Sequence, residues 1–169
     1  MSEILMCRID IAYLNYLRQF DNRVSYNDSG TRMFVGILLE VNGQKYYAPL
    51  SSPKSKHAKI SSQAVDIYKI DGGKLGVINL NNMVPVPDAT IIVIDINQEP
   101  DEKYRVLLQN QLRQIRKDAA RIKKKAQTLY HLIVQKKVPV LSKRCCDYAL
   151  LEMQCAKYSQ QLSAKSNGC

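Results

Sequence analysis

The chain has 169 residues and a mass of 19.2 kDa, which fits one domain with one hydrophobic core. Its formal net charge of +10 favours a polyanionic partner, and nucleic acid above lipid because no basic amphipathic segment carries large apolar residues at an end. The longest apolar run, residues 89–94, is far too short to span a bilayer, and no signal peptide is evident. These totals exclude a membrane protein and predict a cytoplasmic one.

The five cysteines match neither a disulfide framework nor a zinc site. Their number is odd, the expected compartment is reducing, and two of them are adjacent. No Cys-x-x-Cys pair occurs, and neither histidine lies near a cysteine in the sequence. We therefore expect no metal and no cofactor, with Cys145, Cys146 and Cys155 as small core residues and Cys169 in a loose tail.

The first half of the chain predicts a mostly antiparallel, strongly curved sheet of about six strands. A strand leads to Asp10, which can cap a helix that ends near residue 19. Asn42-Gly43 is a strong hairpin signal between two apolar runs. The expected strands cover residues 4–9, 33–41, 44–50, 65–70, 75–80 and 90–96, with a short edge segment at 83–86.

The second half predicts helices. Apolar residues recur every three or four positions from Leu108 to Ile133, which indicates one long helix that Pro139 ends. A coiled coil is an alternative reading, but the alanines in the stripe equally suit packing on a sheet. A last helix covers about 142–162. We expect an α+β protein with a single domain over 1–162 and a disordered tail at 163–169.

The predicted long helix carries concentrated positive charge. Between Arg113 and Lys137, Asp118 is the only acidic residue. A merely solvated face usually mixes both signs, so this basic C-terminal helical region favours RNA binding. The candidate RNA-binding residues here are Arg113, Arg116, Lys117, Arg121, Lys124, Lys125 and Lys136.

The segment that follows the third predicted strand gathers polar groups into seven residues. It holds Ser51, Ser52, Lys54, Lys56 and His57, and two prolines restrain its backbone. Hydroxyls and fixed cations without a carboxylate suit a phosphate oxyanion. A plain polar loop with two exposed lysines is the alternative.

Four blocks of sequence carry a family resemblance. They are residues 13–21, 34–54, 75–86 and 111–116. In this order they resemble the ToxN/AbiQ family, the endoribonuclease toxins of type III toxin–antitoxin and phage-abortive-infection systems, and are similar to its CptN branch. The resemblance covers roughly residues 4–135.

The resemblance implies a fold and an activity. The fold would be a strongly bent antiparallel sheet, partly a barrel similar to MazF/Kid, surrounded by helices. The activity would be metal-independent cleavage of single-stranded RNA that leaves a 2′,3′-cyclic phosphate and a 5′-hydroxyl. The antitoxin would be a repeat RNA folded as pseudoknots, with no protein antitoxin. The toxin would trim this RNA and close with it into a cyclic assembly that serves phage abortive infection or plasmid maintenance.

The resemblance also implies site residues. The family's active-site loop matches Ser51, Ser52 and Lys54. A tyrosine of the first helix matches Tyr13, and a basic residue before the central strand matches Arg32. These five are the candidate catalytic residues.

Two family aromatics have no clean match. Tyr26 lies close to the loop tyrosine but out of register, since Asp28 is the aligned residue. Gln109 or Gln114 stands where the family has an aromatic on the long helix, so a stacking role there loses its basis. Tyr26 stays a candidate RNA-binding residue.

Cleavage by the substrate's own 2′-hydroxyl asks the protein to align it, to stabilise negative charge and to move protons. We expect Lys54 to bind the non-bridging oxygens, with both serines orienting the phosphate and Arg32 binding it bidentately. Tyr13 would stack on a base or position a water. The sequence does not identify the general base. Lys54 or Lys56 would serve as the general acid if its pKa were lowered.

His57 has a suitable unperturbed pKa but no match in the family pattern, so the sequence favours an exposed loop histidine that contacts RNA. The alternative function is a non-catalytic RNA-binding protein that uses the same basic surface. A domain that binds an acidic protein ranks lowest, because the basic residues cluster on one helix beside a loop that suits phosphate.

Overall fold

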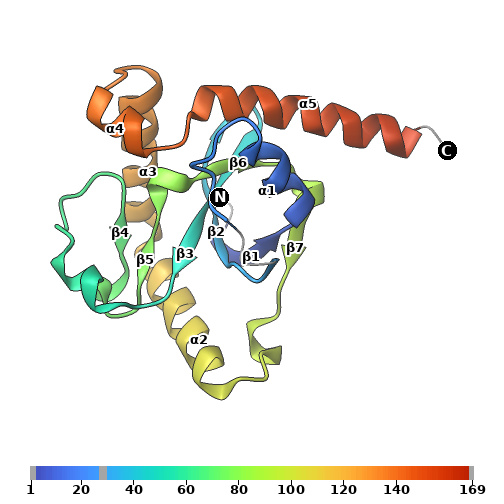
Figure 1. The fold of residues 1–169 in the computed structure, drawn as a ribbon. Coiled ribbons are helices and arrows are strands. Elements are labelled where there is room, and N and C mark those ends of the chain that lie inside the picture. The colour runs from blue at the N-terminus through green and yellow to red at the C-terminus, as the bar shows by residue number, and fades with distance from the viewer. Residues whose placement is uncertain (1–2, 27–29, 168–169) are drawn as a thin grey trace.

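The structure is a computed structural model, and it describes residues 3–26 and 30–167. These residues form an α+β fold in which helices surround one seven-stranded antiparallel sheet (Figure 1). The strand order is β4-β5-β3-β2-β1-β7, and β6 pairs with β3 off this path. Within the described residues the end strands β4 and β7 do not pair, so the sheet is not a closed barrel.

Most strands are short, and the central hairpin holds the longest two. The strands are β1 (Leu5–Ile9), β2 (Phe34–Val41), β3 (Gln44–Ser51), β4 (Tyr68–Lys69), β5 (Val77–Ile78), β6 (Val84–Val86) and β7 (Ile91–Val93). Asn42 and Gly43 join β2 to β3 with positive φ angles of 50° and 80°, as a two-residue hairpin turn requires. The predicted hairpin is thereby confirmed.

The sequence overestimates the later strands. The runs predicted as strands at 65–70 and 75–80 contain only β4 and β5, because short 3-10 turns over Ile70–Gly73 and Leu80–Asn82 interrupt them. The predicted strand at 90–96 is reduced to β7, an edge strand whose Val93 side chain is 86% exposed.

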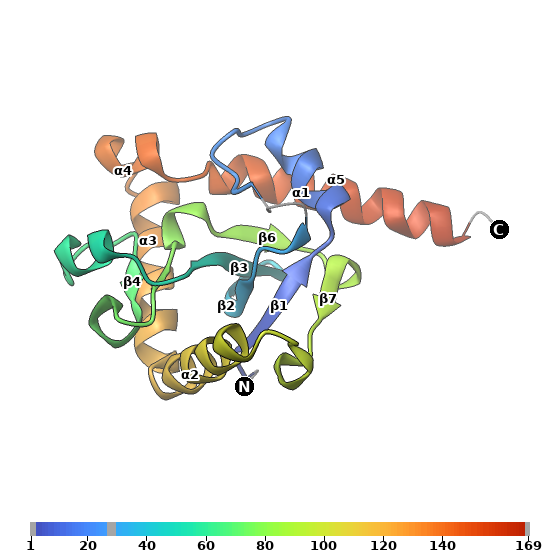
Figure 2. The same cartoon turned by 60° about the horizontal axis from the view of Figure 1, so that its bottom comes forward.

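Five helices lie in the described part of the chain. They are α1 (Ile11–Arg18), α2 (Glu102–Lys117), α3 (Ala119–Val134), α4 (Pro139–Arg144) and α5 (Tyr148–Asn167). Asp10 caps α1 as predicted, since its Oδ1 accepts a hydrogen bond from the backbone N–H of Ala12 at 2.9 Å. In both views α1 and α5 lie on one side of the strands and α2 on the other (Figures 1 and 2).

The prediction of one long helix is wrong, because α2 and α3 meet at Asp118. This residue leaves helical geometry with φ −95° and ψ 8°. Its buried carboxylate accepts hydrogen bonds from the side chains of Gln114 and Arg121. The lone acid of the basic run therefore fixes the corner between two helices, and the basic residues lie on two helices instead of one.

The end of the chain also differs from expectation. Pro139 begins α4 instead of only ending the helix before it, and α5 continues to Asn167. Residues 163–167 are therefore helical, whereas a disordered tail was predicted from 163. Asp28 and Cys169 lie outside the described residues.

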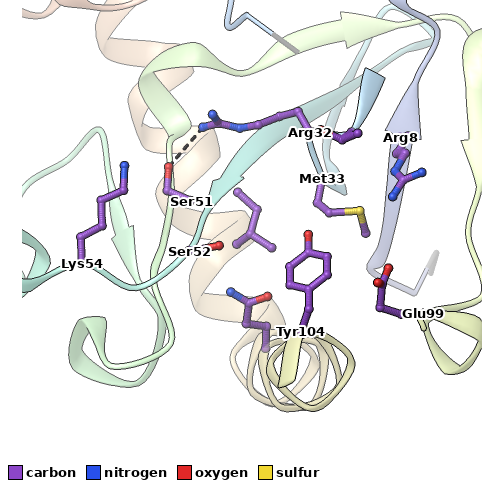
Figure 3. A pocket seen from close by; sticks show the side chains of 11 residues that line it. Arg8, Arg32, Met33, Ser51, Ser52, Lys54, Glu99 and Tyr104 are labelled. Carbon is purple, nitrogen blue, oxygen red and sulfur yellow. Dashed lines mark hydrogen bonds between the residues drawn. The ribbon is translucent and has the colours of Figure 1, made fainter. Parts of the chain in front are cut away.

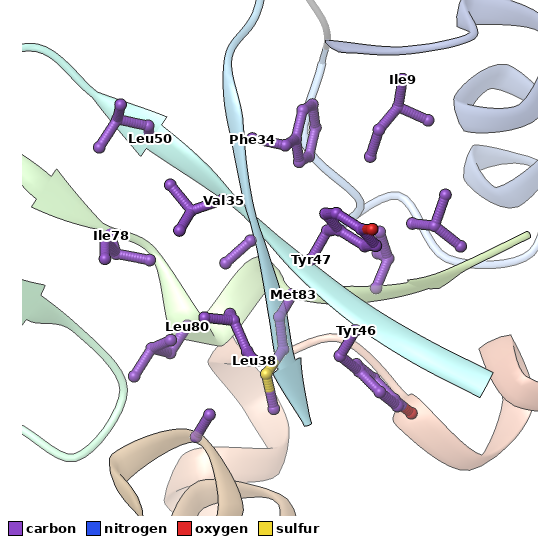
Figure 4. Packing of buried hydrophobic residues seen from close by; sticks show 14 of the residues in the cluster. Ile9, Phe34, Val35, Leu38, Tyr46, Tyr47, Leu50, Ile78, Leu80 and Met83 are labelled. Carbon is purple, nitrogen blue, oxygen red and sulfur yellow. The ribbon is translucent and has the colours of Figure 1, made fainter. Parts of the chain in front are cut away.

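The core forms around the central hairpin. Phe34, Val35 and Leu38 of β2 pack with Tyr46 and Tyr47 of β3 (Figure 4). The predicted placement of three cysteines in the core is confirmed, since Cys145, Cys146 and Cys155 are all buried. No helix among the described residues is long and apolar enough to cross a bilayer.

Candidate active site

A cavity of about 460 Å³ lies where β1, the start of β2, the end of β3 and α2 meet (Figure 3). Segments far apart in the sequence supply its walls. The lining residues are Arg8, Thr31, Arg32, Met33, Leu50, Ser51, Ser52, Lys54, Glu99, Tyr104 and Gln111. The cavity thus brings together four of the five predicted catalytic residues, which are Arg32, Ser51, Ser52 and Lys54.

The hydrogen bonds around Ser51 leave its hydroxyl proton available for donation. Its Oγ accepts from Nη2 of Arg32 at 3.1 Å and from Nδ2 of Asn79 at 2.8 Å (Figure 3 draws the first). A hydroxyl has two acceptor lone pairs and one donor proton, so these two bonds leave the O–H of Ser51 to donate elsewhere. A phosphate oxygen in the cavity is a suitable acceptor for it.

The end of β3 is held by a close approach from β5. Ser51 pairs with Val77, and Gly76 precedes that pair with a φ of +99°. A Cβ atom at Gly76 would lie 2.0 Å from the carbonyl oxygen of Ser51. Only glycine meets both demands, so this residue fixes where the serine hydroxyl sits.

The backbone of Lys54 is tied to His57 in both directions. Nδ1 of His57 accepts from the backbone N–H of Lys54 at 3.1 Å, and the N–H of His57 donates to the carbonyl of Lys54 at 2.9 Å. His57 is only 1% exposed, and this burial, followed by the charges of Lys56 and Lys54, lowers its pKa. The neutral imidazole is thus the form that holds the loop.

The prediction that His57 is exposed is therefore wrong. His57 is buried within the 3-10 turn over Ser55–Lys59, and its backbone carbonyl and Cβ lie close to Gly73. Lys56 is exposed on the same turn and stays available to RNA.

The placement of Tyr13 in the catalytic site is also wrong. Its side chain is 0% exposed, its hydroxyl donates to the carbonyl of Pro85 at 2.5 Å, and its ring packs edge-on against Tyr158 of α5. The side chain of Tyr13 thus faces the core between α1 and α5 and does not line the cavity. Tyr26, by contrast, is 65% exposed, with the Arg18 guanidinium 5.2 Å from its ring centroid.

The predicted basic surface is divided. On α2, Arg113 and Arg116 line a second cavity of about 750 Å³ beside β7, and Arg116 also pairs with Glu3 at 3.1 Å. On α3, Arg121 pairs with Asp118 and the half-buried Lys125 lies 5.8 Å from the ring centroid of Tyr68. The exposed members with open surroundings are Lys117, Lys124 and Lys136.

Several cavity residues escaped sequence analysis. Arg8 comes from β1, Glu99 from the segment before α2, and Tyr104 and Gln111 from α2. No local pattern marks them, because only the fold brings them to the loop that holds Lys54. Asn79 lay within a block of the family resemblance, but nothing in its spacing pointed to Ser51.

Among the described residues, no three His, Cys, Asp or Glu side chains gather where they could hold a metal ion. The donors that face the cavity are cations and hydroxyls, which bind anions directly.

Residues 5–156 match the family model described as toxin ToxN of type III toxin–antitoxin systems. The endoribonuclease ToxN of Pectobacterium atrosepticum is 31% identical over 169 residues, which cover 95% of this chain and 96% of that protein.

Two solved structures agree with this match. One, from work on a processed non-coding RNA that regulates a bacterial antiviral system, is 32% identical with a TM-score of 0.78, and the match covers 89% of this chain and 96% of that one. The other, from work on selective toxin inhibition by an RNA pseudoknot in type III toxin–antitoxin systems, is 28% identical with a TM-score of 0.82, covering 94% and 99%. Since the match runs through the whole sheet, through α1 to α4 and into α5, the chain belongs to the ToxN family of type III toxin–antitoxin toxins.

Proposed function

We propose that this chain is an endoribonuclease toxin that cleaves single-stranded RNA in the cavity that holds Ser51, Ser52 and Lys54. The observation that carries the proposal is the arrangement around Ser51. Arg32 and Asn79 occupy both acceptor positions of its hydroxyl, so the O–H can donate, and Lys54 stands at the edge of the same cavity. The relatives are named endoribonucleases, which supports the same activity.

The proposed reaction is a transesterification within the RNA. The 2′-oxygen forms a bond to phosphorus, its proton passes to a base, and the bond from phosphorus to the 5′-oxygen breaks as that oxygen takes up a proton. The products are a 2′,3′-cyclic phosphate and a 5′-hydroxyl. Since the substrate brings its own nucleophile, the protein contributes alignment and charge stabilisation and needs no metal.

Each cavity residue has a part in this reaction. Lys54 stabilises the negative charge that grows on the non-bridging oxygens. Ser51 and Ser52 donate hydrogen bonds to the same phosphate, and Arg32 holds both Ser51 and the anion. His57 acts on Lys54 through the backbone and does not touch the RNA.

We further propose that an RNA antitoxin inhibits and is processed by this toxin, with no protein antitoxin. One relative's structure concerns inhibition by an RNA pseudoknot, and another concerns a processed non-coding RNA in antiviral defence. A folded RNA that spans α2, α3 and the cavity would bury Lys54, and units of toxin and RNA would close into a ring. The exposed Lys117, Lys124 and Lys136 supply phosphate contacts.

We also propose one toxin domain whose bent sheet is partly barrel-like and similar to MazF/Kid, as the family resemblance implies. A single hydrophobic cluster runs from β1 through the central hairpin to α3 and α5. The α5 residues of this cluster end at Tyr158, which supports a single domain that ends near residue 162, although the helix itself continues to Asn167.

Lys54→Ala tests the enzyme assignment. The purified protein is incubated in EDTA with mixed single-stranded RNA, and both ends of every product are mapped. We expect discrete cuts with cyclic phosphate ends, and a rate about 100- to 1000-fold lower in the variant because one oxyanion contact is lost. RNA binding by the variant should persist.

Lys59→Ala is the matched control, since it removes an exposed lysine of the neighbouring turn that does not line the cavity. Its rate should equal that of the unchanged protein. Tight RNA binding without cuts by any of the three proteins would instead establish the alternative function, a non-catalytic RNA-binding protein.

A further inference from the structure

Glu99 is an unexpected residue to find in a phosphate-binding cavity. It is the one carboxylate among the lining residues, where the other charged groups are Arg8, Arg32 and Lys54. No ion pair to Glu99 occurs within residues 3–26 and 30–167, and its carboxylate accepts a 3.3 Å hydrogen bond from the backbone N–H of Asp101. A carboxylate repels phosphate, so Glu99 serves another part of the ligand.

Gln111 presents an unused acceptor at the same cavity. Its side chain is 1% exposed, and its Nε2 donates to the carbonyl of Leu75 at 2.8 Å, which fixes the orientation of the amide. Its buried Oε1 accepts no hydrogen bond from any described residue. An unpartnered buried acceptor costs about 1–3 kcal/mol, and such a group in a cavity wall points to a ligand that supplies the donor.

Tyr104 adds an aromatic surface to the cavity that Glu99 and Gln111 also line. Figure 3 shows Glu99 and Arg8 on the side of the cavity away from Lys54, with the Tyr104 hydroxyl directed into the space between. Burial raises the pKa of Tyr104, Arg8 opposes this shift and Glu99 adds to it, so both charges reach its hydroxyl. Tyrosine rings in such positions stack on unpaired bases.

We infer that Glu99, Tyr104 and Gln111 form a subsite for one nucleobase next to the scissile phosphate, and that this base carries an exocyclic amine. The inference rests on the proposed function and deepens it, because it gives the site a sequence preference. Adenine, cytosine and guanine offer amine N–H donors to the two acceptors. Uracil has a single N3–H donor flanked by two carbonyl oxygens, so it can satisfy only one of the two acceptors, and its oxygens are repelled by the carboxylate.

The test is a cleavage-site profile. The unchanged protein, Glu99→Gln and Glu102→Gln are each incubated with a pool of random single-stranded RNA, and the base frequencies around every cut are counted. Glu102 lies exposed at the start of α2 outside the cavity, so its variant makes the same chemical change without touching the subsite.

We expect the unchanged protein to disfavour uracil at one position beside the cut. Glu99→Gln should raise uracil there by about tenfold, because an amide can donate to a carbonyl oxygen, and leave the other positions unchanged. Glu102→Gln should reproduce the original profile. A Glu99→Gln profile equal to the original at every position, or no position that disfavours uracil, overturns the subsite. No cuts by the unchanged protein overturn the proposed function itself.

Discussion

His57 is a buried side chain that holds the backbone of Lys54, the residue proposed to bind the phosphate. Its Nδ1 accepts from the backbone N–H of Lys54, and only a neutral imidazole can do so. Protonation would place an N–H against an N–H and break this bond. The charges of Lys56 and Lys54 already work against protonation, so the bond holds at neutral pH.

We expect this bond to make the protein sensitive to acid. The pKa of His57 lies below its usual 6.5, so as pH falls through 6.5 the unfolded chain takes up a proton before the folded one. The free energy of unfolding should therefore be greatest above pH 6.5 and fall below it. Denaturant unfolding and cleavage rates between pH 5 and 8 measure both effects.

Two substitutions at His57 distinguish its hydrogen bond to Lys54 from the packing of its side chain. His57→Asn keeps an acceptor near the place of Nδ1 and cannot titrate, so it should retain cleavage and flatten the loss below pH 6.5. His57→Ala should reduce cleavage at every pH. The same acid-side loss in His57→Asn as in the unchanged protein would show that another group titrates.

Gly76 offers a second test at the residue scale. Gly76→Ala would put a Cβ 2.0 Å from the carbonyl oxygen of Ser51 at a φ of +99°. We expect it to lower the free energy of unfolding by about 3 kcal/mol and to reduce cleavage, because Ser51 must move. Gly72→Ala is the control, since φ is +64° but nothing lies within 4 Å, and about 1 kcal/mol is expected. If chemical denaturation showed equal losses in the free energy of unfolding for the two variants, the close approach of Gly76 to Ser51 would not explain the effect.

At the scale of elements, Glu152 anchors α5 to the rest of the molecule. Its carboxylate accepts from the hydroxyl of Tyr46 on β3 at 2.9 Å and from that of Tyr130 on α3 at 2.8 and 3.0 Å. Glu152→Ala should lower the free energy of unfolding by about 2–4 kcal/mol, because two tyrosine hydroxyls lose their charged acceptor. Lys157→Ala, an exposed change on the same helix, should stay within about 0.5 kcal/mol. Similar unfolding midpoints for the two variants would contradict this anchoring.

The elements that local signals define were predictable from the sequence. Asn42-Gly43 specified the hairpin, and Asp10 specified the start of α1. The break at Asp118 was not predictable, because the apolar period continues through it and only the buried carboxylate with its partners turns the chain. The later strands were overestimated, since apolar runs also form 3-10 turns packed on a core.

The candidate site also contains residues that the local sequence identifies and residues that only the fold identifies. Ser51, Ser52 and Lys54 lie within four residues at the end of β3, so the sequence alone could predict them as a phosphate-binding group. The prediction for Tyr13 was wrong because helix periodicity shows which side chains share a face of α1 but not which element packs against that face. Here that element is α5. No sequence pattern marks Gln111 as a site residue. Only its unpaired oxygen and the neighbouring cavity, both seen in the structure, make it a candidate.

At the scale of the whole molecule, the charge of +10 predicts RNA binding that weakens with salt. Each lost contact to single-stranded RNA should reduce the slope of log K against log salt by about 0.7. Replacing Lys117 and Lys124 by Gln should therefore reduce it by about 1.4. Replacing Lys143 and Lys157, which are exposed on α4 and α5, removes the same charge. An equal change in slope from both pairs would show that net charge, and not a defined surface, binds the RNA.

The cavity walls have a consequence for the synthesis of the protein. A ribosome releases the loop with Lys54 early, but Tyr104 and Gln111 follow only after more than half of the chain has been made, and α3, which packs on β2, follows later still. Because domains fold as units while the chain emerges, a nascent polypeptide that stops before α2 carries the reactive loop without the pocket that employs it. We therefore expect a chain that ends before α2 to leave RNA uncut, so the protein should gain activity only late in its own synthesis.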